Sequence, residues 1–120
     1  MYEINIYKTR NGKEPYIEWL ESLDRTVRAR IKARLTRIQE TNNLGIHDPV
    51  GDGIFELKFD FGPGYRVYFG FKNDTFLILL FGGNKKRQQK DIDKAKEYWR
   101  EHLSLKRGKK WENIENIKNI

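Results

Sequence analysis

The sequence predicts a single α+β domain in the order strand, two helices, three strands, helix. Its 120 residues are enough for one hydrophobic core and too few for two cores of ordinary size. Several short segments are rich in apolar residues at strand spacing, and longer segments between them repeat apolar residues at helical spacing. No internal repeat interrupts this order, so the elements are expected to share one core.

The first half of the chain supplies the first strand and both N-terminal helices. A strand is expected at residues 2–8, where apolar and polar residues alternate. A turn at residues 10–13 leads to a short helix opened by Pro15, because the first helical position tolerates a missing amide hydrogen. Asp24 is expected to cap a longer helix that ends near residue 42. The apolar stripe of this second helix is Val27, Ile31, Leu35 and Ile38.

The second half supplies the rest of the sheet. Residues 45–53 contain Gly, Asp and Pro and are interpreted as a connecting loop. Alternating segments at 55–59 and 65–71 predict a hairpin, and the apolar run from Phe76 to Phe81 predicts a central strand buried on both faces. A final helix then runs through Trp99. The domain is expected to occupy residues 1–105, with a basic tail at 106–120 that is either a short helix or a mobile extension.

Charge and composition narrow the classes of function. Lys and Arg number 24 against 17 Asp and Glu, which gives a net charge of +7. This charge fits a protein that binds a polyanion such as a nucleic acid, and it fits equally well a soluble basic protein that has no such partner. The absence of cysteine excludes disulfides, cysteine nucleophiles and thiolate metal sites. His47 and His102 lack metal-ligand spacing, so neither a metal nor a cofactor is expected. With no signal peptide or membrane-length apolar run, we expect a cytoplasmic protein that does not bind membranes.

One face of the predicted sheet carries candidate catalytic residues. Glu56, Lys58 and Asp60 share a strand face, as do Arg66 and Tyr68 on the next strand. Both sets are expected to point away from the helices, so replacing an arginine there should leave folding intact. Lys85, Lys86 and Arg87 follow the next strand and would close one side of a cationic, aromatic-edged surface suited to RNA. The alternative is a solvated face with cross-strand ion pairs, such as one between Glu56 and Arg66.

A second cationic group decorates the second helix. Its basic residues surround the apolar stripe with little acidic compensation, and as a group they could bind the phosphates of a large RNA without sequence preference. The alternative is an ordinary solvated helix face. The RNA-binding candidates are Arg28, Arg30, Arg34, Arg37, Lys86 and Arg87.

Several runs of residues together resemble a known family. The helical half carries Trp19-Leu20, Leu23-Asp24-Arg25 and Val27-Arg28-Ala29-Arg30-Ile31. The sheet half carries residues 49–57, the run Gly62-Pro63-Gly64-Tyr65-Arg66-Val67-Tyr68-Phe69 and residues 79–85. The last helix adds Asp91-Ile92, Ala95 and Tyr98-Trp99. In this order and spacing, over about residues 2–100, the chain resembles the addiction-module killer proteins, a HigB-like branch of the RelE/ParE toxin superfamily.

The resemblance implies a fold and a function. The fold would be RelE-like, with two N-terminal helices packed on a twisted, mainly antiparallel four-stranded sheet and a C-terminal helix. The protein would be the toxin of a type II toxin–antitoxin system, a metal-independent endoribonuclease that cleaves messenger RNA on the ribosome. Its partners would be the ribosome and a cognate antitoxin, often a helix-turn-helix protein, through which alone it would reach operator DNA. Within the site, Arg66 would stabilise charge on the scissile phosphate, assisted by Lys58 and by Lys85 or Arg87.

Two departures from the family pattern leave the proton transfers open. Glu56 stands where RelE has a second lysine, and Ile92 falls near the position of its C-terminal aromatic residue. Glu56 as base and Tyr68 as acid are hypotheses, and a structural ion pair and a packed tyrosine fit these two residues equally well. Two other functions therefore stay open, a ParE-like poison of DNA gyrase and a non-catalytic partner that acts only in an operator-binding complex with the antitoxin.

Overall fold

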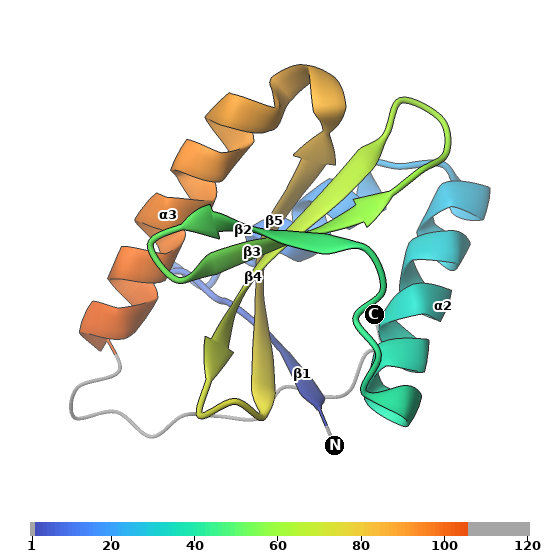
Figure 1. Ribbon diagram of the computed structural model, residues 1–120. Helices are drawn as coiled ribbons and strands as arrows, with labels where there is room; N and C mark the ends of the chain where they lie inside the picture. The colour runs from blue at the N-terminus through green and yellow to red at the C-terminus, as the bar shows by residue number, and fades with distance from the viewer. Residues whose placement is uncertain (1, 106–120) are drawn as a thin grey trace.

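The computed structural model describes residues 2–105, which form three α-helices and a five-stranded sheet (Figure 1). The predicted tail at 106–120 lies outside the described residues. The elements are β1 (Glu3–Ile6), α1 (Pro15–Glu21), α2 (Arg25–Thr41), β2 (His47–Gly51), β3 (Ile54–Phe59), β4 (Tyr65–Lys72), β5 (Phe76–Asn84), the 3-10 turn η1 (Lys85–Arg87) and α3 (Gln88–Leu105). Among these residues no helix is both long enough and apolar enough to cross a bilayer.

The strands lie in the order β1-β5-β4-β3-β2, and only β1 and β5 pair in parallel. The predicted hairpins and the mainly antiparallel sheet are confirmed, whereas the expected count of four strands is wrong. The fifth strand is β2, which lies within the predicted loop at 45–53 and pairs with β3. Almost all residues of β2 are exposed, because this strand lies at the edge of the sheet.

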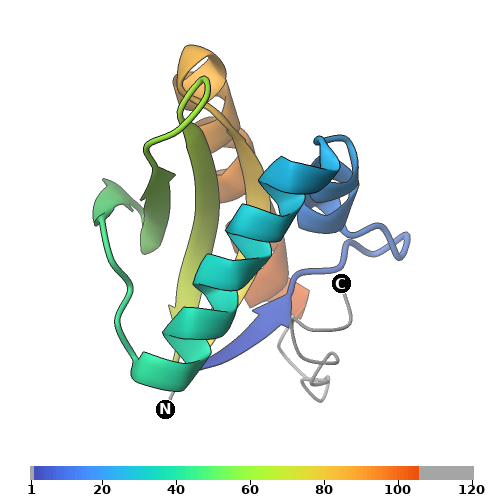
Figure 2. The same ribbon diagram turned by 90° about the vertical axis from the view of Figure 1, so that its right-hand side faces the viewer.

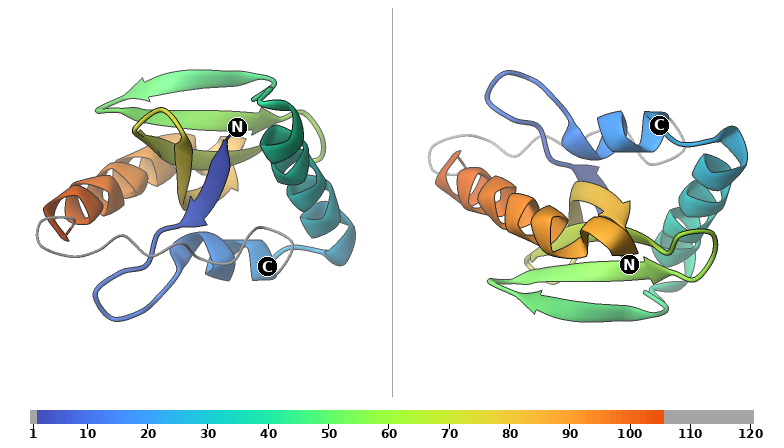
Figure 3. Two further views of the ribbon diagram at one scale, coloured as in Figure 1. Left: turned by 90° about the horizontal axis from the view of Figure 1, so that it is seen from below. Right: turned by 90° about the horizontal axis from the view of Figure 1, so that it is seen from above.

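The helices form two layers, with the sheet between them. Helices α1 and α2 cover one face, where the core contains Leu20, Ile31, Leu35 and Ile38. Helix α3 covers the other face through Ile92, Ala95 and Trp99. Figure 2 shows α2 lying across the near face of the sheet, and both views in Figure 3 place α2 and α3 on opposite sides. The face expected to be open is therefore largely covered by a helix.

Local sequence explains where the elements begin and end. Pro15 is the first residue of α1, and Asn42 ends α2 in the left-handed conformation with φ of 59°, which asparagine tolerates better than most residues. Asn73 and Asp74 both have positive φ and lie at the centre of the turn between β4 and β5, which is closed by a hydrogen bond from the Thr75 amide to the Lys72 carbonyl at 3.2 Å. Asp24 occupies the predicted N-cap position of α2, yet its side chain makes no capping hydrogen bond.

Glycines on β4 and β5 let the helices approach the sheet closely. A Cβ atom at Gly82 would lie 2.2 Å from the Trp19 ring of α1, and one at Gly70 would lie 2.6 Å from the Trp99 ring of α3. At Gly83 the obstacle would be the carboxylate of Asp91, at 1.8 Å. The pairing of β4 with β5 contains a bulge between Tyr68 and Phe69, which shifts the register of β5, the strand that carries Gly82 and Gly83.

Candidate RNA-binding and catalytic site

The structure brings the predicted catalytic residues together on the face of the sheet that α3 covers. Lys58 is the register partner of Arg66, and Glu56 is the register partner of Tyr68, so all four share this face. Lys85 joins them from η1, because its backbone amide donates to the carbonyl of Gly64 at 2.8 Å. A Cβ atom at Gly64 would lie 3.4 Å from Lys85 Cβ and 3.5 Å from Arg66 Nη1, which places both side chains beside the β3–β4 turn.

Arg66 and Glu56 are buried, contrary to the expectation of an open face. Arg66 is 7% exposed and Glu56 is 3% exposed. The two side chains form an ion pair with 3.9 Å between Arg66 Nε and Glu56 Oε1, and Arg66 Nη1 donates to the backbone carbonyl of Tyr65 at 3.1 Å. This is the cross-strand pair that the alternative interpretation of the sequence described.

Gln88, at the start of α3, holds Glu56 in place. Its side-chain amide donates to both carboxylate oxygens of Glu56, at 3.0 and 3.1 Å. A buried carboxylate needs such donors because burial removes its hydration. Glu56 is thus oriented toward Gln88 and Arg66, and its part as a base has no support in this geometry.

Tyr68 is also a core residue. It is 0% exposed, and it packs with Ile78, Leu80 and Trp99 under α3. Burial raises the pKa of the Tyr68 hydroxyl, and the nearby carboxylates of Glu56 and Asp91 raise it further. A phenol in this position is a poor proton donor to a bound RNA, so the structure supports the packed tyrosine over the general acid.

Lys58 lies nearer to solvent and is paired with an acidic residue of the edge strand. Lys58 Nζ is 2.5 Å from Asp48 Oδ2, and the two side chains are 29% and 53% exposed. The hydrogen bond that Lys58 donates to the Asp48 carboxylate raises the pKa of Lys58, which therefore stays protonated, and the same bond lowers the pKa of the Asp48 carboxyl. Lys58 is suited to stabilise negative charge and is unsuited to act as a base.

Asp91 is a site residue that the sequence interpretation did not select. Its carboxyl is 4% exposed and packs against Gly83, which is the register partner of Arg66. Burial raises the pKa of Asp91, and the positive charge of Arg87 partly offsets this effect. The signal that could have found it was Gly83, near the end of β5, because a glycine there leaves room for a side chain of the following helix.

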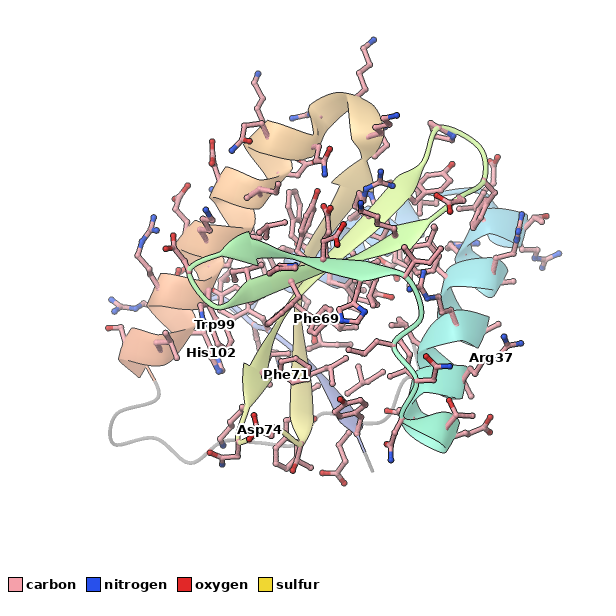
Figure 4. The ribbon with its side chains drawn as sticks, in the orientation of Figure 1. Arg37, Phe69, Phe71, Asp74, Trp99 and His102 are labelled. Atoms are coloured by element: carbon pink, nitrogen blue, oxygen red, sulfur yellow. The ribbon has the colours of Figure 1, made fainter. Side chains whose placement is uncertain are left out.

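The predicted RNA-binding residues divide into surface and structural groups. Lys85, Lys86 and Arg87 are exposed on η1, and Arg37 lies on the outward side of α2 (Figure 4). Arg34, in contrast, is turned toward the protein: its guanidinium donates to the carbonyls of Leu44 and Ile46 at 2.7 and 2.8 Å and to that of Lys58.

Arg34 thus ties α2 to the chain around β2 and β3. Burial lowers its pKa, and the Phe59 ring lies 4.5 Å from its guanidinium carbon. The expectation that Arg34 binds RNA is corrected for this reason, because its donors already have backbone acceptors. Arg30 and the half-buried Arg28 keep their place as candidates on the same helix.

The two histidines lie on different elements of the structure. His47 lies on the exposed edge strand β2, where its Nδ1 is 2.8 Å from the carbonyl of Gly45. His102 is buried on α3, where its ring stacks on Trp99 with centroids 5.3 Å apart (Figure 4). Within residues 2–105, no three acidic or histidine side chains are grouped as metal ligands would be.

Comparisons with known proteins place the chain in a family. The model of the family described as Phage derived protein Gp49-like (DUF891) matches residues 18–100, which include the whole site. An uncharacterized protein of Haemophilus influenzae (strain Rd) is 48% identical over 79 residues, covering 65% of this chain and 79% of that protein. Because the family model matches more than half of the sequence, the chain belongs to the Gp49-like family of phage-derived proteins.

Proposed function

We propose that this protein is the toxin of a type II toxin–antitoxin module and that it cleaves messenger RNA on the ribosome. The kinship of Gp49-like proteins with the RelE/ParE toxins supports the first part. The observation that carries the second part is the convergence of Lys58, Arg66 and Lys85, from three different elements, beside the β3–β4 turn. Such a group of cations suits a phosphate more than a protein surface.

The cations fit the charge that develops during RNA cleavage. In metal-free cleavage the 2′-oxygen loses its proton and bonds to phosphorus, the bond to the 5′-oxygen breaks, and that oxygen takes up a proton. Negative charge builds on the phosphate oxygens during this step, and preorganised donors there lower the barrier. The exposed Lys85 would contact the phosphate, and Lys58 would add a second protonated amine. The buried Arg66 would stabilise the negative charge of the phosphate electrostatically without being exposed on the surface.

A second candidate is a ParE-like poison of DNA gyrase. The specific observation in its favour is the burial of Glu56 and Tyr68, which removes the two acid–base candidates from direct contact with a substrate. A gyrase poison needs no proton transfer, so this candidate does not depend on them. A non-toxic partner in an operator complex is the third alternative.

Mapping the 5′ ends of transcripts after brief induction separates the three. Under the proposal, growth stops and new transcript ends appear in register with codons within minutes. Induction of the DNA-damage response without new ends would instead indicate gyrase, and undisturbed growth would indicate a non-toxic partner. Either result contradicts the proposal.

Two matched charge reversals make the same experiment residue-specific. Lys85→Glu is expected to abolish the new ends, because it places an anion beside the phosphate. Lys94→Glu is the control, since Lys94 is exposed on α3, where it forms a surface ion pair with Glu97 and lies over the Tyr98 ring. Equal cleavage by the two variants, at equal abundance, would move the site away from η1.

A further inference from the structure

Arg30 and Phe61 form a stacked pair at the surface. The guanidinium carbon of Arg30, on α2, lies 3.7 Å from the centroid of the Phe61 ring, which belongs to the turn between β3 and β4. Arg30 is exposed and Phe61 is half-buried, so the aromatic ring supports the guanidinium from the protein side. We name these two residues the Arg30–Phe61 platform.

Neighbouring rings hold Phe61 in a fixed position. Its centroid is 5.4 Å from that of Tyr65 and 6.3 Å from that of Phe59, and Tyr65 in turn contacts Trp19 at 6.4 Å. The turn itself is closed by a hydrogen bond from the amide of Gly64 to the carbonyl of Phe61 at 3.0 Å. The platform therefore rests on packed aromatic residues and a closed turn.

Arg30 differs from the other arginines of α2 in what it leaves available. Arg34, one turn later, donates to three backbone carbonyls, and Arg37 is exposed without a supporting ring among residues 2–105. For Arg30, within the part of the chain described, no carboxylate or hydrogen-bond acceptor engages the guanidinium. Its outer planar face and its edge donors remain available to a ligand.

The platform and the cationic group of the proposed site share the β3–β4 turn. Tyr65, which contacts Phe61, accepts a hydrogen bond from Arg66 through its carbonyl. Tyr65 is also the register partner of Asn84, the residue before Lys85. A flat stacking surface and phosphate-binding cations thus lie at the same turn, the platform on the side of the sheet that α2 covers and Arg66 on the side that α3 covers.

We propose that the Arg30–Phe61 platform binds an unpaired base of single-stranded RNA while the cations on the other side of the β3–β4 turn bind phosphates of the same strand. Unstacked RNA bases stack on guanidinium planes as well as on aromatic rings, and neither surface requires a particular base. This inference rests on the proposed nuclease function, and it adds the subsite that would hold a nucleotide beside the scissile phosphate. An acidic protein segment would use the positive charge and would have no need of the planar stack.

Binding of two single-stranded RNA oligonucleotides to the full-length protein, without ribosomes, tests the stack separately from the charge. One oligonucleotide is intact and the other has abasic residues, which keep the phosphates and remove the stacking surfaces. The intact RNA is expected to bind at least about fivefold more tightly, the change that corresponds to about 1 kcal/mol of stacking. Arg30→Lys keeps the charge and removes the plane, so it should lose this preference, whereas Arg37→Lys should keep it.

The possible failures are distinguishable from one another. If Arg30→Lys and Arg37→Lys discriminate between the two RNAs equally well, the platform is not a base-binding site, although the proposed nuclease could still produce codon-phased ends in cells. If the wild-type protein binds both RNAs equally, or if poly-glutamate displaces them as well as RNA does, the inference is overturned. Phe61→Leu gives a second route to the same answer, because it removes the support of Arg30 and leaves every charge in place.

Discussion

Replacing Arg66 with alanine is expected to destabilise the fold, because it leaves the Glu56 carboxylate buried without its ion-pair partner. The two side chains are 8% and 3% exposed, so water cannot replace the guanidinium. Removing one member of a buried pair typically costs about 3–5 kcal/mol, and the two hydrogen bonds from Gln88 to Glu56 favour the lower end of this range. We expect a loss of about 3 kcal/mol in the free energy of unfolding. For a chain of this size that lowers the melting temperature by about 10 °C.

A second substitution shows whether the uncompensated charge is the cause. Glu56→Gln in the Arg66→Ala background replaces the buried carboxylate with a neutral amide, which should recover about 1–2 kcal/mol of the loss in urea unfolding. Glu97→Gln is the matched control, because its exposed pair with Lys94 should change stability by less than about 1 kcal/mol. The reasoning is refuted if Arg66→Ala costs less than about 1 kcal/mol or if Glu56→Gln fails to recover stability.

This prediction also decides how a loss of toxicity should be interpreted. Arg66→Ala alone confuses a missing charge with a missing fold, whereas the double variant with Glu56→Gln retains more folded protein. If the folded double variant still produces codon-phased transcript ends at the wild-type level, Arg66 has no part in charge stabilisation. If the ends disappear, the loss can be attributed to the site.

Three further predictions concern α2, the start of α3 and the turn before it. Arg34→Ala should lower the free energy of unfolding by about 2–3 kcal/mol, because three carbonyls lose a charged donor. Arg37→Ala should change the free energy of unfolding by less than about 0.5 kcal/mol. Equal losses for the two variants in urea titrations would contradict the structural role of Arg34. Burial raises the pKa of Asp91 in the folded protein above its value in the unfolded chain, so the contribution of Asp91 to stability falls as the pH rises from the unfolded pKa through the folded pKa. Asp91→Asn should therefore be more stable than wild type at neutral pH and equal to it near pH 3. The same dependence of stability on pH in both proteins would contradict this. Lys86→Gln combined with Arg87→Gln should reduce the slope of log affinity for RNA against log salt by about two, and an unchanged slope would place the phosphates elsewhere.

Much of the fold could be predicted because the core strands and helices carry strong periodic patterns. The alternation at residues 54–59 and 65–72 and the apolar run in β5 determine these strands and their order. The edge strand β2 could not be predicted in this way, since it buries almost nothing and contains Pro49 and Gly51. It exists through backbone pairing with β3, for which side-chain patterns give no signal.

The composition of the site could be predicted better than its exposure. Alternation correctly grouped Glu56 with Lys58 and Arg66 with Tyr68. The pattern of the last helix, however, says only that one side of it is apolar and does not say which face of the sheet that side covers. Helix α3 lies on the face that carries these polar residues, and this single fact converts Glu56, Arg66 and Tyr68 from surface groups into interior ones.

The parallel pairing of β1 with β5 imposes an order on the folding of the chain. Residues 3–6 hydrogen-bond to residues 76–79, so among the described strands β1 has no neighbour until β5 has been synthesised. Contacts between such distant segments raise the contact order and slow folding relative to helical proteins of the same length, because a long loop must close before the pairing stabilises it. Within the described sheet, β1 therefore stays unpaired until β5 has been synthesised, and the sheet that carries Arg66 is completed only then.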